Sequence, residues 1–348
     1  MAVAAQVVPK SRKKLVRRAP RDTSQRLRRA VQLLFLALNV WIGIQFCVFV
    51  RFYESGGRTA WAERPPGVEG WLPIAALMNL KVFLLTGRVP SLHPAGMFLL
   101  IAFLAISLLF RKAFCGWLCP VGTVSEMLWR LGRRLFRRNF RLPRWADVPL
   151  RALKYALLGL FLFAVVTMSV TAIAAFLEGP YGIIDDVKML NFFRYLGVTG
   201  AVVLGLLAVA SIFAQNFWCR YLCPYEALTG LAALLSPARI RREPGVCIDC
   251  AKCAKACPSL LPVDRLITVR SAECTACLEC VAVCPAEGAL AMSLPRRRRM
   301  PAWALAAGIA VVFLGTVALA QWAGYWRTDL PSRVYFDLIP RAQEFAHP

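Results

Sequence analysis

Two cysteine runs restrict what this chain can fold into more than any other feature of its sequence. Residues 247–258 read CIDCAKCAKACP and residues 274–285 read CTACLECVAVCP, so the pattern C-x2-C-x2-C-x3-C-P occurs twice, 27 residues apart. A 4Fe-4S cubane needs four thiolates, and in two-cluster proteins with this spacing three come from one run and the fourth from the other. The two-residue gaps wrap three corners of a cube, and the proline then turns the chain away.

This geometry predicts two ligand sets. The first comprises Cys247, Cys250, Cys253 and Cys284, and the second comprises Cys274, Cys277, Cys280 and Cys257. Alanines fill many of the gaps, which suits a close approach of the backbone to a cluster. Zinc sites and disulfides are the alternatives, but zinc is usually bound by two spaced pairs of ligands. The runs therefore predict two 4Fe-4S clusters in a compact ferredoxin-like α+β unit over residues 240–292.

The rest of the chain is apolar enough for a membrane. The sequence is 58% hydrophobic with a mean hydropathy of +0.55, and apolar runs of about 17–25 residues predict transmembrane helices. We expect five such spans, at about residues 31–50, 95–110, 152–177, 195–214 and 302–322. A shorter stretch at 71–87 contains Lys81 and predicts an interfacial or re-entrant helix. The predicted fold is an all-α membrane bundle of about five helices in a tandem repeat, with the α+β unit attached.

The basic residues predict an orientation for this bundle. The formal net charge is +24, which by itself fits nucleic acid, a membrane surface or topology signals. One set of segments carries 32 Lys and Arg residues and the alternate set carries 10. The first set comprises residues 1–30, 111–151 and 215–300, and the second comprises residues 51–93, 178–194 and 323–348. The positive-inside rule makes the first set cytoplasmic and the C-terminal tail external. Because the charge follows membrane sides and no nucleic-acid motif accompanies it, we expect membrane lipids and not nucleic acid as its partner.

A second cysteine motif occurs twice within the predicted bundle. CGWLCP at 115–120 and CRYLCP at 219–224 each follow a span that runs from outside to inside. A tandem repeat of this kind can pack about an axis normal to the membrane, which would bring the two motifs together. The candidate site is a four-thiolate group for a further metal centre or redox-active thiols, formed by Cys115, Cys119, Cys219 and Cys223. Helix termination, disulfides and separate sites are the alternatives, and a reducing cytoplasm disfavours disulfides.

Charged residues near these motifs suggest roles that depend on their burial. Three cations would stabilise thiolates there, namely Arg111, Lys112 and Arg220. Glu126 and Glu226 follow the motifs and would be able to take protons from a quinone, although glutamates on a helix surface are more often solvated. We expect solvation also for the acidic residues of the outer loop, Glu178, Asp185 and Asp186. Cys47 stands alone in the first span and predicts a packing role.

Several common cofactor signatures are missing from the sequence. It contains no CxxCH, no G-x-G-x-x-G and no G-x-x-x-x-G-K-[ST], and its two histidines, His93 and His347, lie outside the predicted spans. The sequence therefore lacks the usual residues for covalent c-type haem and for a haem held by two histidines in the bundle. It also lacks those for nicotinamide or ATP chemistry. Electrons would have to enter and leave through redox protein partners or through quinone in the bilayer.

At these cysteine motifs the chain resembles the membrane-bound polyferredoxins. These include NapH-type subunits, the C-terminal half of NosR-type regulators, and CcoG-type assembly proteins. The resemblance covers about residues 31–292. It implies a four-span repeat over 31–239 and a cytoplasmic ferredoxin domain over 240–292, in a bacterial inner membrane. It also implies electron transfer between quinol or a cytoplasmic donor and a redox partner, as in a quinol dehydrogenase-type subunit.

The chain departs from this family in one outer loop and after the ferredoxin unit. The outer flavin-binding domain of NosR-type chains does not fit in the 43-residue loop at 51–93. Residues 293–348 add a fifth predicted span and an external tail, and residues 1–30 form a basic N-terminal segment. Two other functions stay open. One is a metallocofactor-assembly or copper-handling reductase, because copper(I) suits the thiolates of the CxxLCP motifs. The other is a redox sensor that signals through the tail.

Overall fold

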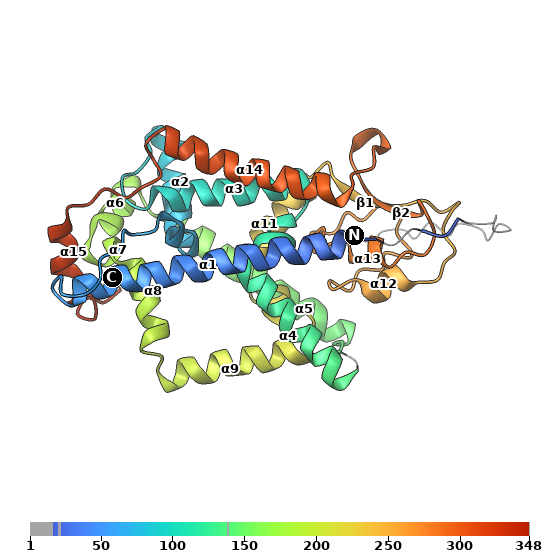
Figure 1. Ribbon diagram of the computed structural model, residues 1–348, viewed down its shortest axis with the longest axis horizontal. Helices are drawn as coiled ribbons and strands as arrows, with labels where there is room; N and C mark the ends of the chain where they lie inside the picture. Colours follow the sequence, from blue (N-terminus) through green and yellow to red (C-terminus); the bar gives the residue numbers. More distant parts are fainter. Residues whose placement is uncertain (1–16, 20–21, 138, 348) are drawn as a thin grey trace.

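The computed structural model describes residues 17–19, 22–137 and 139–347 (Figure 1). The molecule is elongated, and helix α1 (Ser24–Glu54) runs along much of it and contacts α14 (Ala302–Trp322), which lies beside α3 (Pro94–Phe110). One end carries the two cysteine runs and is called the cysteine end below. The opposite end carries three short helices, α6 (Val170–Glu178), α7 (Pro180–Ile183) and α8 (Asp185–Arg194), together with the C-terminal helix α15 (Ser332–Leu338). Most of the predicted basic segment lies outside the described residues.

Membrane-spanning helices are present, as the hydropathy predicts. Three described helices are long and apolar enough to cross a membrane: α1, α14 and the Trp145–Thr167 part of α5 (Arg144–Thr167). Helices α8 (Asp185–Arg194) and α9 (Val198–Phe213) form a fourth candidate, bent by 81° at a short break. Helix α3 and helix α2 (Pro73–Thr86) are apolar but shorter. The predicted count of five spans stays a prediction.

The apolar run at 152–177 is not one continuous helix. Helix α5 ends at Thr167, and a new helix, α6 (Val170–Glu178), follows it. The break occurs at Ser169, whose hydroxyl accepts a hydrogen bond from the backbone N–H of Ala172 at 3.0 Å. A serine in this position caps a helix N-terminus and satisfies one of its unpaired N–H groups. Hydropathy misses such a break because both sides of it are equally apolar.

Lys81 explains how helix α2 tolerates a charge in an apolar stretch. Its ammonium group donates hydrogen bonds to the backbone carbonyls of Val165 at 3.1 Å and Val166 at 2.9 Å, and also to that of Met168. The last carbonyls of a helix have no partner within the helix, and a cation there is favourable. Helix α2 therefore caps the C-terminal end of α5.

The remaining helices are short and connect these longer ones. They are η1 (Pro66–Trp71), η2 (Phe114–Leu118), α4 (Pro120–Phe136), α7 (Pro180–Ile183), α10 (Phe217–Tyr221), α11 (Pro224–Leu234) and η3 (Pro295–Arg297). The CxxLCP motifs occupy two equivalent places among them. One motif spans the junction of η2 and α4, and the other spans the junction of α10 and α11.

The cysteine end contains a small mixed unit. Strand β1 (Arg239–Arg242) pairs antiparallel with β2 (Leu290–Ser293), with Ile240 opposite Met292. Between them in the sequence lie both cysteine runs and the short helices α12 (Lys252–Ala256) and α13 (Glu279–Ala282). The two strands therefore hold together the chain segments on either side of the runs.

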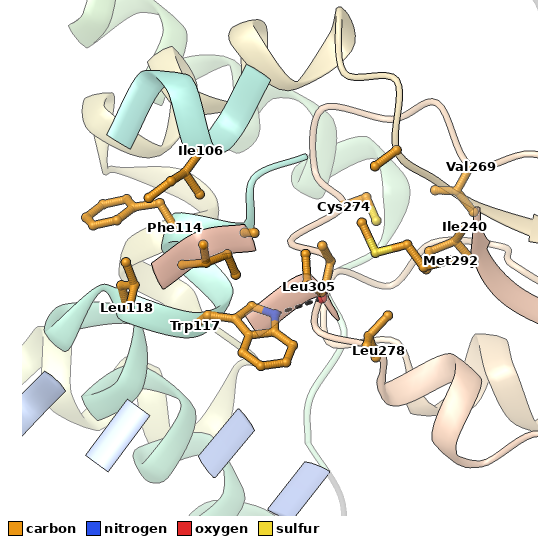
Figure 2. Close-up of a cluster of buried hydrophobic side chains, with 14 of the residues drawn as sticks. Ile106, Phe114, Trp117, Leu118, Ile240, Val269, Cys274, Leu278, Met292 and Leu305 are labelled. Atoms are coloured by element: carbon orange, nitrogen blue, oxygen red, sulfur yellow. Dashed lines mark hydrogen bonds between the residues drawn. The ribbon is translucent and has the colours of Figure 1, made fainter. Parts of the chain in front are cut away.

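An apolar core joins this unit to the membrane helices (Figure 2). Trp117 of η2 is fully buried, and its indole N–H donates a hydrogen bond to the carbonyl of Ala276 at 3.0 Å. Met292 and Leu305 belong to the same core. The neighbouring Gly116 is required, because a Cβ atom there would lie 2.4 Å from the carbonyl oxygen of Thr275. The small mixed unit from β1 to β2, called the cysteine unit below, is thus packed directly onto the first CxxLCP motif.

Candidate functional site

Members of each predicted set of cluster ligands lie near one another, while the division into two sets of four stays a prediction. The thiol of Cys284 lies close enough to Cys247 and Cys250 for their charges to interact, and Cys253 is near Cys247 and Cys284. In the second set, Cys280 interacts in the same way with Cys274, Cys277 and Cys257. Each of the thirteen cysteines is a free thiol. The spacing predicts that each ligand set takes its fourth cysteine from the other run, and the fold is compatible with this arrangement.

The two cysteine runs share an unusual backbone conformation. Asp249 and Ala251 in the first run have φ values of 49° and 54°, and Ala276 and Leu278 in the second have 51° and 59°. These left-handed residues occupy identical positions in the two runs, one on each side of the second cysteine. Left-handed backbone is uncommon for residues other than glycine and produces tight turns. The sequence repeat is thus also a repeat of backbone turns on each side of the second cysteine.

Burial distinguishes the two sets. Cys250 is exposed and the other thiols of the first set are half-buried, whereas Cys257, Cys274 and Cys280 are buried. Burial raises the pKa of Cys277 to about 12 and that of Cys257 to about 11, because a thiolate loses its hydration there. Thiols in such surroundings are protonated near neutral pH unless a bound metal centre compensates the charge.

The four cysteines of the CxxLCP motifs also lie near one another. The thiol of Cys219 interacts with Cys223, Cys119 and Cys115, so the two motifs meet although about a hundred residues separate them. Burial raises the pKa of each of these four thiols. Within residues 17–19, 22–137 and 139–347, no three or more His, Cys, Asp or Glu side chains are arranged to hold a single metal ion. Their role in a further metal centre stays a prediction.

The last cysteine of each motif lies at the N-terminus of a new helix. The sulfur of Cys119 accepts a hydrogen bond from the N–H of Gly122 at 3.5 Å, and the sulfur of Cys223 accepts one from the N–H of Glu226 at 3.4 Å. Both cysteines are thus N-caps, of α4 and α11, with proline in the first helical position. The N-terminus of a helix favours negative charge, so these sulfurs lie in a suitable place for thiolates.

The glutamates after the motifs are not solvated, contrary to the sequence-based expectation. Glu226 is buried and accepts hydrogen bonds from the ammonium groups of Lys112 and Lys154, which are both fully buried. Lys154 also pairs with Glu273 at 2.8 Å, directly before Cys274. We call Lys112, Lys154, Glu226 and Glu273 the inner ion network. Sequence reasoning missed Lys154, although a lysine inside a predicted span is a signal for a buried partner.

Glu126 and the remaining predicted cations have partners of their own. The Glu126 carboxylate accepts hydrogen bonds from Arg28 at 2.7 and 2.8 Å. Arg220 pairs with Asp147 at 2.9 Å, and Arg111 donates to backbone carbonyls. Of the three cations expected to stabilise the motif thiolates, Lys112 interacts with Cys115 and lowers its pKa, but burial outweighs this effect.

An apolar cavity of about 530 Å³ lies against the motifs. Its walls come from α1, η1, α3 and α14, and all four motif cysteines border it. Leu38 and Trp41 of α1 line it and are 44% and 65% exposed, so part of the wall faces out of the protein where lipid would lie. Cavities lined mainly by aliphatic and aromatic side chains suit apolar ligands with a small polar group.

A much smaller cavity, of about 40 Å³, also borders the motifs. Cys115 and Cys219 line it together with Cys277 of the second cluster set and Thr275. The motif cysteines therefore lie between the apolar cavity and the second set of predicted cluster ligands.

The opposite end of the molecule holds a second buried ion network that sequence reasoning missed. Arg64 pairs with Glu69 and with Asp186, each at 2.7 Å, which contradicts the expected solvation of Asp186. The carboxylates of Asp185 and Glu69 raise the pKa of His93 to about 9, although its burial acts in the opposite direction. The tail contributes Thr328, whose hydroxyl donates to Glu69 at 2.8 Å. The C-terminal tail thus folds back onto its own chain.

Comparison with known proteins agrees with the cysteine chemistry. A family described as 4Fe-4S binding domain matches residues 92–143 and again 196–243, so one domain occurs twice and each copy contains a CxxLCP motif. A family described as 4Fe-4S dicluster domain matches residues 239–285. No solved structure matches the chain.

Three relatives extend this comparison. YccM of Escherichia coli (strain K12), whose name assigns it to electron transport, is 48% identical over 92% of this chain and 91% of its own length. The regulatory protein NosR of Pseudomonas aeruginosa is 34% identical over 53% of this chain and 25% of its own length. The ferredoxin-type protein NapH of Haemophilus influenzae is 27% identical over 54% of this chain and 64% of its own length.

Proposed function

Because the chain belongs to the family of membrane-bound iron-sulfur electron-transport proteins that includes NapH and NosR, we propose that it passes electrons between quinol in the bilayer and a redox partner. One observation carries this proposal: an apolar cavity, open towards lipid, has the four motif cysteines on its wall. Such a cavity suits the ring and isoprenoid chain of a quinone.

The eight cysteines of the two runs would hold two 4Fe-4S clusters. Cys247, Cys250, Cys253 and Cys284 would hold one, and Cys274, Cys277, Cys280 and Cys257 the other. The left-handed turns beside Cys250 and Cys277 support this assignment, because they turn both runs tightly at the same position. Each bound cluster supplies the chemistry of taking up or releasing one electron. The protein supplies the thiolates and the apolar shell around the second set.

The order of the cavity and the cysteine groups in the structure supports a path for electrons through the molecule. The apolar cavity borders the motif cysteines, these border Cys277 of the buried set, and the first set reaches the surface at Cys250. We infer that the redox partner docks at the surface near Cys250, and that quinol reacts at the other end of this series. The motif cysteines would then form a thiol relay or hold a further metal centre between them.

The sidedness of the protein is part of the proposal. The distribution of Lys and Arg supports five spans, a ferredoxin-like domain over 240–292 on the cytoplasmic side, the repeat over 31–239, and an external end to residues 293–348. Alkaline phosphatase and green fluorescent protein fused after residue 348 test it. We expect an active phosphatase and a dark fluorescent protein, and the reverse result would invert the topology.

Anaerobic purification with iron analysis and EPR tests the central claim. We expect the iron and labile sulfide of two cubanes, and bleaching of their absorbance by decylubiquinol. Cys280→Ser should lose one cluster, whereas Cys47→Ser, which lies outside both runs, should keep both. A colourless preparation would overturn the cluster assignment, and clusters that dithionite reduces but decylubiquinol does not would overturn the quinol assignment.

A second candidate function is copper handling during metallocofactor assembly. It is favoured by the meeting of four half-buried thiols, two of them at helix N-termini, since copper(I) prefers such soft ligands. Titration with copper(I) under anaerobic conditions distinguishes the two. Tight binding that Cys115→Ser and Cys219→Ser abolish supports copper handling, and binding that survives both substitutions contradicts it.

A further inference from the structure

The apolar cavity contains few polar side chains, and most of them are already paired. The amide groups of Asn39 and Gln45 have hydrogen-bond partners within the protein, and the carboxylate of Glu226 belongs to the inner ion network. A quinone carries two carbonyl groups that need hydrogen-bond donors when water is removed. These three residues therefore offer a headgroup little that is not already in use.

Tyr225 is the exception among the hydroxyl, amide and carboxylate groups of the wall. It follows the second motif directly and borders the cavity together with the four motif cysteines. Its phenol oxygen has no hydrogen bond to any residue that the structure describes, and it is not sealed within packed atoms. A polar group in this state is available to a ligand.

The ring of Tyr225 is held in place by its neighbours. It packs edge-on against Phe114, with ring centroids 5.8 Å apart, and against Phe103, with centroids 6.4 Å apart. Both phenylalanines also line the cavity. Edge-to-face contacts of this kind fix a ring without involving its hydroxyl. The hydroxyl is therefore both preoriented and unused.

We propose that the Tyr225 hydroxyl binds the headgroup of the quinol or quinone and positions it beside the motif cysteines. This inference rests on the proposed function. A hydroxyl both donates and accepts hydrogen bonds, so it pairs with the carbonyl of the oxidised ligand and with the hydroxyl of the reduced one. The indole N–H groups of Trp218 and Trp326, which also border the cavity, only donate. Tyr225 thus serves both redox states as a positioning residue.

Tyr225→Phe tests this role because it removes one oxygen and keeps the packed ring. We expect holoprotein with this substitution to bind decylubiquinone about tenfold more weakly, which corresponds to about 1.4 kcal/mol. Binding is measured by quenching of tryptophan fluorescence, since Trp41, Trp71, Trp218 and Trp326 line the cavity. Tyr195→Phe, in which the replaced tyrosine is 58% exposed and does not line the cavity, is the matched control and should bind as the unsubstituted protein does.

The KM for decylubiquinol is a second quantity to measure, because it would not change if Tyr225 had only a structural role. The KM for decylubiquinol should rise by a similar factor, while iron content and reduction by dithionite stay unchanged. Equal affinity in Tyr225→Phe and the unsubstituted protein would overturn the role of Tyr225 alone, and so would a loss of iron that accompanies the loss of affinity. Failure of the unsubstituted protein to bind decylubiquinone would instead overturn the proposed quinol function.

Discussion

Replacing Glu226 by glutamine perturbs the inner ion network at one atom. Glu226 is 5% exposed and accepts hydrogen bonds from Lys112 and Lys154, which are both 0% exposed. Glu273 provides the second carboxylate, at 2.8 Å from Lys154, so two cations face two anions. Glu226→Gln leaves two buried ammonium groups with a single carboxylate.

The expected loss of stability follows from that imbalance. Removing one partner of a buried ion pair costs about 3–5 kcal/mol, because the remaining charge stays desolvated. In a protein of this size each kcal/mol lowers the unfolding midpoint by about 2 °C, so we expect a decrease of about 6–10 °C. The assay is loss of helical circular dichroism in detergent at a fixed heating rate. Glu178→Gln changes an exposed glutamate and should leave the midpoint unchanged.

A second variant separates charge balance from other effects of the substitution. Lys112→Met together with Glu226→Gln removes one cation and one anion and leaves Lys154 paired with Glu273. We expect this double variant to recover at least half of the lost midpoint, because neighbouring charges are not additive. A midpoint of Glu226→Gln within about 1 °C of the unsubstituted protein, or a double variant no better than the single one, would refute this reasoning.

Three further outcomes follow from the structure. Gly116→Ala forces the cysteine unit away from η2 and should cost about 1–3 kcal/mol and speed its proteolysis, whereas Gly43→Ala, with nothing within 4 Å, should do neither. The pKa of His93 is about 9 in the folded protein, against an ordinary value of 6.5. Protonated His93 therefore stabilises the fold fully below pH 6.5, and this contribution of about 3 kcal/mol is lost once the pH rises above 9. His93→Gln should therefore flatten the midpoint's decrease between these pH values, and an unchanged slope would contradict the assignment. Lys81→Met uncaps α5 and should lower the midpoint by several degrees, while an unchanged midpoint would show that water replaces the cap.

The arrangement of the cysteines was predictable because it depends on local spacing. The two runs predict which thiols gather, and the tandem repeat predicts that Cys115 and Cys219 meet. In the structure Cys280 and Cys219 interact with their predicted neighbours, and the assignment of the ligand sets stays a prediction. Pro120 and Pro224 each begin a new helix, so Cys119 and Cys223 become caps instead of helical neighbours.

The buried ion networks were not predictable from the sequence in the same way. Lys112, Lys154, Glu226 and Glu273 come from four segments separated by tens of residues, and hydropathy treats each of them alone. Only the tertiary packing shows that their charges cancel. The break at Ser169 escaped prediction for the opposite reason, since one hydroxyl within an apolar run decides it.

The docking of the cysteine unit through Trp117 has a consequence for the symmetry of that unit. Its two runs are near copies in spacing and in backbone turns, yet one copy is pressed against the membrane helices and the other meets water at Cys250. Reduction potentials of iron-sulfur centres shift with solvation and with hydrogen bonds to sulfur. A duplicated scaffold thereby acquires two unequal halves, and the difference between them originates in attachment to the bilayer domain and not in the ligands themselves.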